Sequence, residues 1–198
     1  MKRVIVVTGT PCVGKSTLSR QLAARLNAFY VNLTEYANQN GLTLWLDAVR
    51  GTVVVAEEKM RLALVDTIGQ LCCSVVVVDG HFAASVVSNE LSSFVFVLRR
   101  NPVELKAFMQ KEGFSEAKLY ENLAAEILDV CLVEALETHS GDKVYELDIT
   151  GKPIEQTVED VLSIISQEKI CPPDNGNGVV DWIGFLEREG LTDKYLKT

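Results

Sequence analysis

Short apolar runs alternate along the chain with longer segments that are apolar on one side only. Five runs rich in Val, Ile, Leu, Phe and Tyr have the length of buried strands: residues 3–8, 28–33, 74–79, 94–98 and 143–150. Six segments are predicted as helices, most of them from apolar residues at helical spacing: residues 15–26, 34–40, 56–72, 102–110, 115–138 and 153–167. This alternation predicts an α/β fold, a five-stranded parallel sheet with helices on both faces.

Two stretches interrupt the alternation. Residues 42–55 end in a β-branched piece at residues 52–55 and are predicted as a mobile segment with a short extended part. Residues 171–178 (Cys-Pro-Pro-Asp-Asn-Gly-Asn-Gly) cannot continue a helix and predict a linker. The predicted organisation is a domain of residues 1–169, a linker of residues 170–178 and a helical tail of residues 179–198.

The predicted tail has its own apolar face. Val179, Trp182, Ile183 and Leu186 recur at helical spacing, which predicts a short helix that docks on the core or on a partner. The tail is interpreted as an accessory to the domain. Truncation after Lys169 is therefore expected to leave ligand binding by the domain intact.

Composition narrows the class of protein. With 198 residues, 47% hydrophobic and 23% charged, the chain has the make-up of a globular domain. Its apolar runs are far shorter than the roughly 18 residues that span a membrane, and Met1-Lys2-Arg3 leads into a strand instead of a signal peptide. We therefore expect an intracellular, cytoplasmic protein with no membrane partner.

Cysteine usage and charge limit the partners further. The five cysteines form no C-x-x-C pair, which favours reduced thiols over a zinc site. The net charge of -8 argues against general or sequence-specific nucleic-acid binding, which needs a basic face. An acidic surface suits a basic protein partner better.

The strongest chemical signal follows the first predicted strand. Gly9-Thr10-Pro11-Cys12-Val13-Gly14-Lys15-Ser16 fits the phosphate-binding pattern G-x-x-x-x-G-K-[ST], between a strand and a helix as the pattern requires. The glycines let backbone N–H groups approach a phosphate, the helix start adds partial positive charge and Lys15 a full one. The predicted ATP-binding residues are Gly9, Thr10, Pro11, Cys12, Val13, Gly14, Lys15, Ser16, Thr17 and, further along, Lys111.

A second group of candidates follows the strand at residues 74–79. Asp79 ends that apolar run, and in phosphate-loop enzymes a carboxylate at this position holds magnesium. Ser16 and Asp79 are therefore the predicted Mg²⁺ ligands. The predicted catalytic residues are Lys15, Asp79 and His81. The alternative for Asp79 is a simple turn former. His81 could position the attacking group or be a surface residue of a glycine-containing loop.

Several motifs together resemble one family. They are Gly-Thr-Pro-Cys-Val-Gly-Lys-Ser-Thr (Gly9–Thr17), Val-Asp-Gly-His (Val78–His81), Phe-Val-Leu-Arg (Phe96–Arg99) and the stretch Glu112–Ile127 with Lys118, Asn122 and Glu126 at four-residue spacing. Over roughly residues 1–168 the chain resembles the atypical adenylate kinases called isoenzyme six, also described as small-ribosomal-subunit assembly ATPases. Asn122 and Glu126 themselves are interpreted as structural residues on a solvated helix face.

The resemblance implies a fold and an activity. That family is similar to nucleoside monophosphate kinases, so residues 32–55 would form the acceptor-nucleotide segment and residues 111–121 the lid. The implied chemistry is ATP plus AMP to two ADP with Mg²⁺, together with an ATPase activity used while bound to a basic small-subunit ribosomal protein. Two alternatives stay open: a metabolic nucleoside monophosphate kinase with no ribosomal role, and a small-molecule kinase with a non-nucleotide acceptor.

The chain departs from the family where charge matters. Residues 108–113 lack the two arginines usual in the lid, and Ala37-Asn38 lacks the arginine usual in the acceptor segment. Arginines clamp the phosphoryl group in the transition state, and lysine replaces them poorly. Arg50, Arg99 and Arg100 are the remaining candidates for a clamp, so weak kinase activity is expected.

Overall fold

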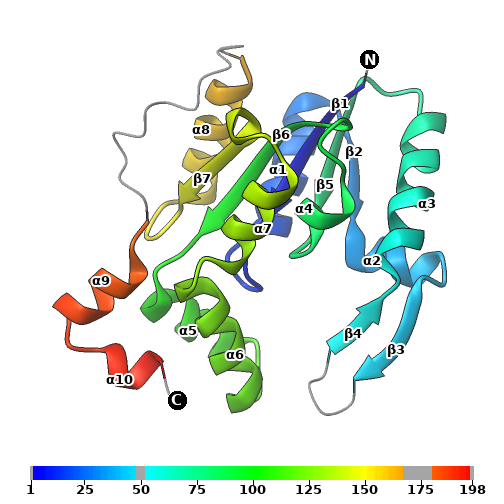
Figure 1. Ribbon diagram of the computed structural model, residues 1–198. Helices are drawn as coiled ribbons and strands as arrows, with labels where there is room; N and C mark the ends of the chain where they lie inside the picture. Colours follow the sequence, from blue (N-terminus) through cyan, green and yellow to red (C-terminus); the bar gives the residue numbers. More distant parts are fainter. Residues whose placement is uncertain (1, 48–51, 167–179, 197–198) are drawn as a thin grey trace.

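The computed structural model describes residues 2–47, 52–166 and 180–196, and its centre is a parallel sheet (Figure 1). The sheet has the strand order β2-β5-β1-β6-β7. The bounds of its strands are β1 Arg3–Thr8, β2 Phe29–Asn32, β5 Val75–Asp79, β6 Ser92–Arg99 and β7 Val144–Asp148. All neighbouring pairs run parallel, so the predicted five-stranded parallel sheet is confirmed.

Helices cover both faces of this sheet (Figure 1). The helices are α1 Lys15–Leu26, α2 Leu33–Gln39, α3 Glu57–Gln70, α4 Ala83–Val86, α5 Pro102–Lys111, α6 Glu116–Ile127, α7 Val130–Thr138, α8 Ile154–Ser166, α9 Trp182–Arg188 and α10 Thr192–Tyr195, with a short 3-10 turn at Gly141–Lys143. None of the helices in the described part of the chain combines the length and apolar character needed to cross a bilayer.

Alternation along the strands sorts the core into two layers. In β1, Ile5 and Val7 pack with α1, α5, α6 and α8, whereas Val4 and Val6 pack with α2, α3, α4 and α7. Successive strand residues point to opposite faces, so a strand buried on both sides is apolar throughout. The sequence Arg3–Thr8 therefore marks the central strand.

The predicted single helix over residues 115–138 is wrong. The chain forms α6 and α7 with a break at Leu128-Asp129, and Asp129 adopts a left-handed backbone with φ 58°. Aspartate tolerates this conformation better than most residues. The break lets the chain cross the sheet edge, because Ile127 packs in one layer and Ala135 in the other.

The segment after α2 is more regular than expected. Strands β3 Thr43–Asp47 and β4 Thr52–Val55 form an antiparallel pair outside the main sheet (Figure 1), where only the second strand was predicted. The clamp candidate Arg50 and the predicted linker at residues 170–178 lie outside the residues that the structure describes.

The C-terminal tail docks on the core. Trp182, Leu186 and Tyr195 are all buried in the layer that contains α5 and α6, and α9 and α10 lie beside those helices (Figure 1). Of the two possibilities that the sequence left open, docking on the core is the one observed. The tail therefore contributes to the hydrophobic core.

We expect Leu186→Ala to destabilise the protein. Leu186 is fully buried, so truncation leaves a cavity and costs about 2–5 kcal/mol of unfolding free energy. Ile183→Ala on the same helix is the control, because Ile183 is 42% exposed and its loss should cost well under half as much. Urea unfolding measures both. Equal effects of the two substitutions would contradict the docked arrangement.

A buried histidine makes stability depend on pH. His139 Nε2 lies 2.9 Å from the Ala84 carbonyl oxygen, which can only accept, so Nδ1 accepts from Ser92 Oγ at 3.0 Å. Burial lowers the pKa of His139 below its ordinary value. In the window between this lowered pKa and about 6.5, the unfolded chain binds a proton that the folded chain does not, so stability falls as pH falls.

The measurement is urea unfolding at several values between pH 7.5 and pH 5. We expect a loss of at most about 1.4 kcal/mol per pH unit from His139. His139→Gln keeps one donor and one acceptor without titrating, so its stability should vary less over the same range. A wild-type curve that rises toward pH 5, or one that His139→Gln leaves unchanged, would refute the assignment.

Candidate active site

The loop between β1 and α1 is shaped to receive phosphate. Gly9 has φ +136°, and a Cβ there would lie 2.5 Å from the Leu98 carbonyl oxygen. Gly14 has φ +113° and precedes the first turn of α1, whose N–H groups are free to bind an anion. Only glycine fits both positions without strain. The sequence pattern Gly9–Ser16 therefore forms the loop that its spacing predicted.

Lys15 is the first residue of α1, and its side chain reaches back to this loop. Its Nζ donates to the Thr10 carbonyl oxygen over 2.9 Å, and the residue is only 9% exposed. Burial lowers the pKa of Lys15, while the charges of Asp79 and Glu126 act in the opposite direction. An ammonium held by one neutral carbonyl among nearby carboxylates is ready to exchange that carbonyl for a phosphate oxygen.

Asp79 lies beside the loop, at the carboxyl end of β5. It is 1% exposed, accepts from Tyr30 Oη at 2.6 Å and lies 3.4 Å from Asn32 Nδ2. Burial and this hydrogen bond to Asp79 raise the pKa of Tyr30. The Ser16 hydroxyl and the Asp79 carboxylate offer oxygens of the type that Mg²⁺ prefers.

His81 follows two residues after Asp79 and has no side-chain hydrogen bond to it. Its backbone carbonyl accepts from Thr8 Oγ1 at 3.1 Å, and its ring packs edge-on against Phe82. The residue is exposed, yet desolvation by neighbouring protein atoms and the charges of Lys15 and Lys118 lower its pKa to about 4. The imidazole is therefore neutral at pH 7 and able to accept a hydrogen bond.

Contrary to the expectation from sequence, Arg99 is not free to clamp a phosphate. Its side chain is 2% exposed and surrounded by acceptors, because Nε donates to Glu126 Oε1 over 2.9 Å and the other nitrogens pair with Asp129 and Glu146. A buried guanidinium needs this compensation. Arg99 therefore belongs to an internal ion network below the loop.

Glu126 also differs from its sequence interpretation. It is 2% exposed, not solvated, and accepts hydrogen bonds from Thr10 Oγ1 at 2.6 Å and from the Arg100 backbone N–H at 3.1 Å. Asn122, one turn earlier, is 6% exposed, and its Nδ2 atom has no hydrogen-bond partner. The four-residue spacing of these polar residues on α6 was the available signal, and it marks a buried face beside the phosphate loop.

Arg100 is the predicted clamp residue that does reach the site. Its Nε donates to the Val13 carbonyl oxygen over 3.2 Å, it pairs with Glu104, and its guanidinium lies 4.9 Å from the centre of the Phe108 ring. A cavity of about 380 Å³ opens here. Its lining residues are Cys12, Val13, Gly14, Lys15, Ser16, Thr17, Arg100, Phe108, Glu112 and Phe114. Lys111 is exposed and does not line this cavity.

A larger hollow lies elsewhere. It has a volume of about 540 Å³ and is lined by Arg3, Leu26 and residues of α8. Arg3 begins β1, so this hollow lies at the amino ends of the strands, whereas parallel α/β sheets bind ligands at the carboxyl ends. We therefore assign the smaller cavity at the phosphate loop as the candidate active site.

Together the sheet and the loop define a fold like that of phosphate-loop kinases. Solved structures with this fold include a shikimate kinase from Acinetobacter baumannii (TM-score 0.61, 18% identity, 85% of this chain and 96% of that one) and a thymidylate kinase from Candida albicans (TM-score 0.53, 15% identity, 85% and 93%). A family model described as an AAA domain matches residues 5–129, more than half of the chain.

Full-length relatives make the family more specific. A protein of Methanothermobacter thermautotrophicus named "Putative adenylate kinase" is 37% identical over 92% of this chain and 99% of its own. One of Pyrococcus furiosus with the same name is 34% identical over 93% of both chains. The chain therefore belongs to this family of adenylate kinase-like nucleotide kinases.

We expect Lys15→Ala to abolish turnover while the protein stays folded. The ammonium contacts one carbonyl and supplies charge instead of apolar packing, so its loss removes phosphate stabilisation worth at least about 100-fold in rate. The measurement is ATP turnover together with the melting temperature. Lys59→Ala, on the exposed side of α3, is the control and should behave as wild type. Normal turnover in Lys15→Ala would remove the loop from the active site.

Proposed function

We propose that this chain transfers the γ-phosphoryl group of ATP to AMP, forming two ADP, and also hydrolyses ATP. The observation that carries the proposal is the arrangement of Lys15 and Asp79 around the phosphate loop, with Lys15 Nζ on the Thr10 carbonyl. The shared name of the relatives supports nucleotide phosphorylation, since those proteins are named adenylate kinases.

Magnesium would enter this site with the triphosphate. The donor chemistry fits, because Ser16 offers a hydroxyl and Asp79 a carboxylate held by Tyr30 and Asn32. Mg²⁺ keeps several waters and often takes one or two protein oxygens plus phosphate oxygens. In the described part of the chain, no group of three or more His, Cys, Asp or Glu side chains is placed to hold a metal. The ion supplies charge neutralisation on the phosphates.

The residues of the chain then have distinct roles. Lys15 leaves Thr10 to contact the transferred phosphoryl group, and the loop N–H groups hold the remaining phosphates. His81, neutral at pH 7, is able to accept a hydrogen bond from the attacking hydroxyl or water.

We infer that the kinase activity is weak. Arg100 is the one guanidinium of the three candidates that lines the cavity within the described residues, and it is already shared with Glu104 and Val13. Loss of a single transition-state donor typically costs roughly 100- to 1000-fold in rate. An enzyme that lacks the two lid arginines should therefore phosphorylate AMP slowly.

A role in small-ribosomal-subunit maturation is the finer part of the proposal. The motifs that resemble the assembly ATPases suggest it, and the charge of -8 favours a basic small-subunit ribosomal protein as partner in the cytoplasm. One surface supports this: Leu128 at the end of α6 and Val130, Val133 and Leu136 on α7 are each about half exposed. Acidic residues Glu134 and Glu137 lie on the same helix.

One preparation tests these activities. ADP formation from ATP plus AMP is compared with phosphate release from ATP alone, with and without a purified basic small-subunit ribosomal protein, and Lys15→Ala is the blank. We expect slow AMP phosphorylation and phosphate release that the partner stimulates and salt suppresses. Fast AMP conversion with no effect of the partner would leave a metabolic kinase. Phosphorylation of a non-nucleotide acceptor alone would favour the small-molecule kinase.

A further inference from the structure

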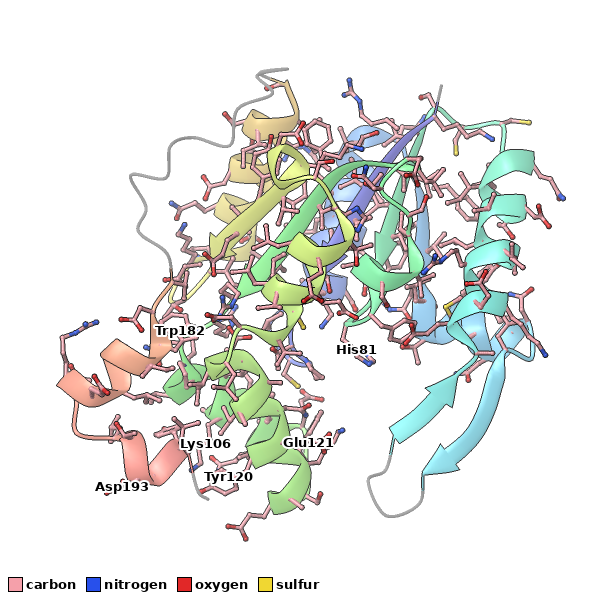
Figure 2. The ribbon with its side chains drawn as sticks, in the orientation of Figure 1. His81, Lys106, Tyr120, Glu121, Trp182 and Asp193 are labelled. Atoms are coloured by element: carbon pink, nitrogen blue, oxygen red, sulfur yellow. The ribbon has the colours of Figure 1, made fainter. Side chains whose placement is uncertain are left out.

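The C-terminal tail contacts the same buried carboxylate that holds the phosphate loop. Trp182 Nε1 donates to Glu126 Oε1 over 3.0 Å, and Thr10 Oγ1 donates to Glu126 Oε2 over 2.6 Å. All three residues are at most 7% exposed. Figure 2 shows Trp182 where α9 meets the rest of the chain. One carboxylate therefore joins the loop after β1 to a helix near the end of the chain.

The tail also contacts a second carboxylate of the same network. The Val180 backbone N–H lies 3.4 Å from Glu146 Oε2, and both Glu146 and Glu126 pair with the buried guanidinium of Arg99. Tail residues thus supply one donor to each of two carboxylates around Arg99. Hydrogen bonds to buried charged groups are stronger than those in water.

A separate contact anchors the end of the tail. Lys106 Nζ donates to Tyr120 Oη over 3.0 Å and lies 4.9 Å from the centre of the Tyr195 ring (Figure 2). This contact joins α10 to α5 and α6 without touching Glu126. It attaches the tail separately from the contacts of Val180 and Trp182 with the carboxylates, and Trp182 is the tail residue that contacts Glu126 directly.

Thr10 is the point where the tail network meets the active site. Its hydroxyl is held by Glu126, and its carbonyl accepts from Lys15 Nζ. A change in the position of Glu126 therefore shifts the residue against which Lys15 rests. Loss of the Trp182 donor leaves Glu126 Oε1 with one fewer hydrogen bond and admits water to a buried charge.

We propose that Glu126 is a positioning residue for the phosphate loop and that the docked tail, through Trp182, sets the affinity of that loop for nucleoside triphosphate. The proposal rests on the proposed function only in naming ATP as the ligand. Coupling between two sites is reciprocal, so ATP must stabilise tail docking by the factor by which the docked tail strengthens ATP binding. Truncation after Lys169, expected from sequence to leave binding intact, should instead weaken it.

The first test compares two conservative changes in the tail. Trp182→Phe keeps an aromatic ring and removes the donor to Glu126, and we expect ATP to bind about fivefold more weakly by calorimetry. Tyr195→Phe is the matched control, because it also removes one polar group from a buried tail ring but leaves Trp182 in place. It should bind ATP as wild type does. Unchanged affinity in Trp182→Phe, or an equal loss in both variants, would overturn the proposal.

The second test locates the path of the coupling. The Thr10 hydroxyl donates to Glu126, so a variant without this hydroxyl breaks the path at the phosphate loop, and its own ATP affinity is the baseline. Thr10→Val removes the hydroxyl, so adding Trp182→Phe should weaken binding no further. If the two effects multiply instead, the tail acts through overall stability and Glu126 does not position the loop.

The third test uses the unaltered protein and does not depend on any variant folding. ATP binding should slow hydrogen exchange of the Trp182 indole N–H, measured by NMR with and without saturating ATP·Mg²⁺. Exchange that ATP leaves unchanged would refute the coupling. These readouts measure ATP binding, so a failure to phosphorylate AMP would contradict the proposed function without affecting them.

Discussion

The carboxylate of Glu126 is the constraint on which the rest of the structure depends. It accepts from Thr10 Oγ1, Arg99 Nε, the Arg100 backbone and Trp182 Nε1, four donors from the phosphate loop, β6, the turn after β6 and the tail. A buried carboxylate costs free energy unless its oxygens are satisfied and its charge is balanced, and here both conditions are met. Segments far apart in sequence must therefore assemble together before this charge can be buried.

The order of the strands explains why the candidate active-site residues lie close together. β1 lies between β5 and β6, so its loop, Asp79 and the Arg99-Arg100 pair reach the same edge of the sheet. The alternation of strand side chains then separates two adjacent arginines, with Arg99 turned into the ion network and Arg100 against the Val13 carbonyl. Because the two arginines are adjacent in sequence, the Arg99 guanidinium lies in the buried ion network and the Arg100 guanidinium lines the cavity.

Local signals in the sequence were sufficient to predict the phosphate loop and the buried strand that ends in Asp79. Gly9 and Gly14 need positive φ, and the Val75–Val78 run ending in Asp79 needs burial on both faces, so both features could be predicted from neighbouring residues. The roles of Glu126 and Arg99 could not, because a polar residue on a helix reveals its burial only when partners 27 and 116 positions away are known. The break at Asp129 was missed for a similar reason, since crossing from one layer to the other is a tertiary requirement.

The same contacts explain how binding at the loop affects distant residues. Lys15 Nζ rests on the Thr10 carbonyl with N–H donors to spare, and Thr10 is fixed by the carboxylate that also accepts from Trp182. The Arg100 guanidinium pairs with Glu104 and donates to the Val13 carbonyl at the edge of the cavity. Both cations at the cavity therefore already have internal partners that hold them in place. This arrangement agrees with the function that we propose, in which nucleotide binding is linked to the conformation of the protein.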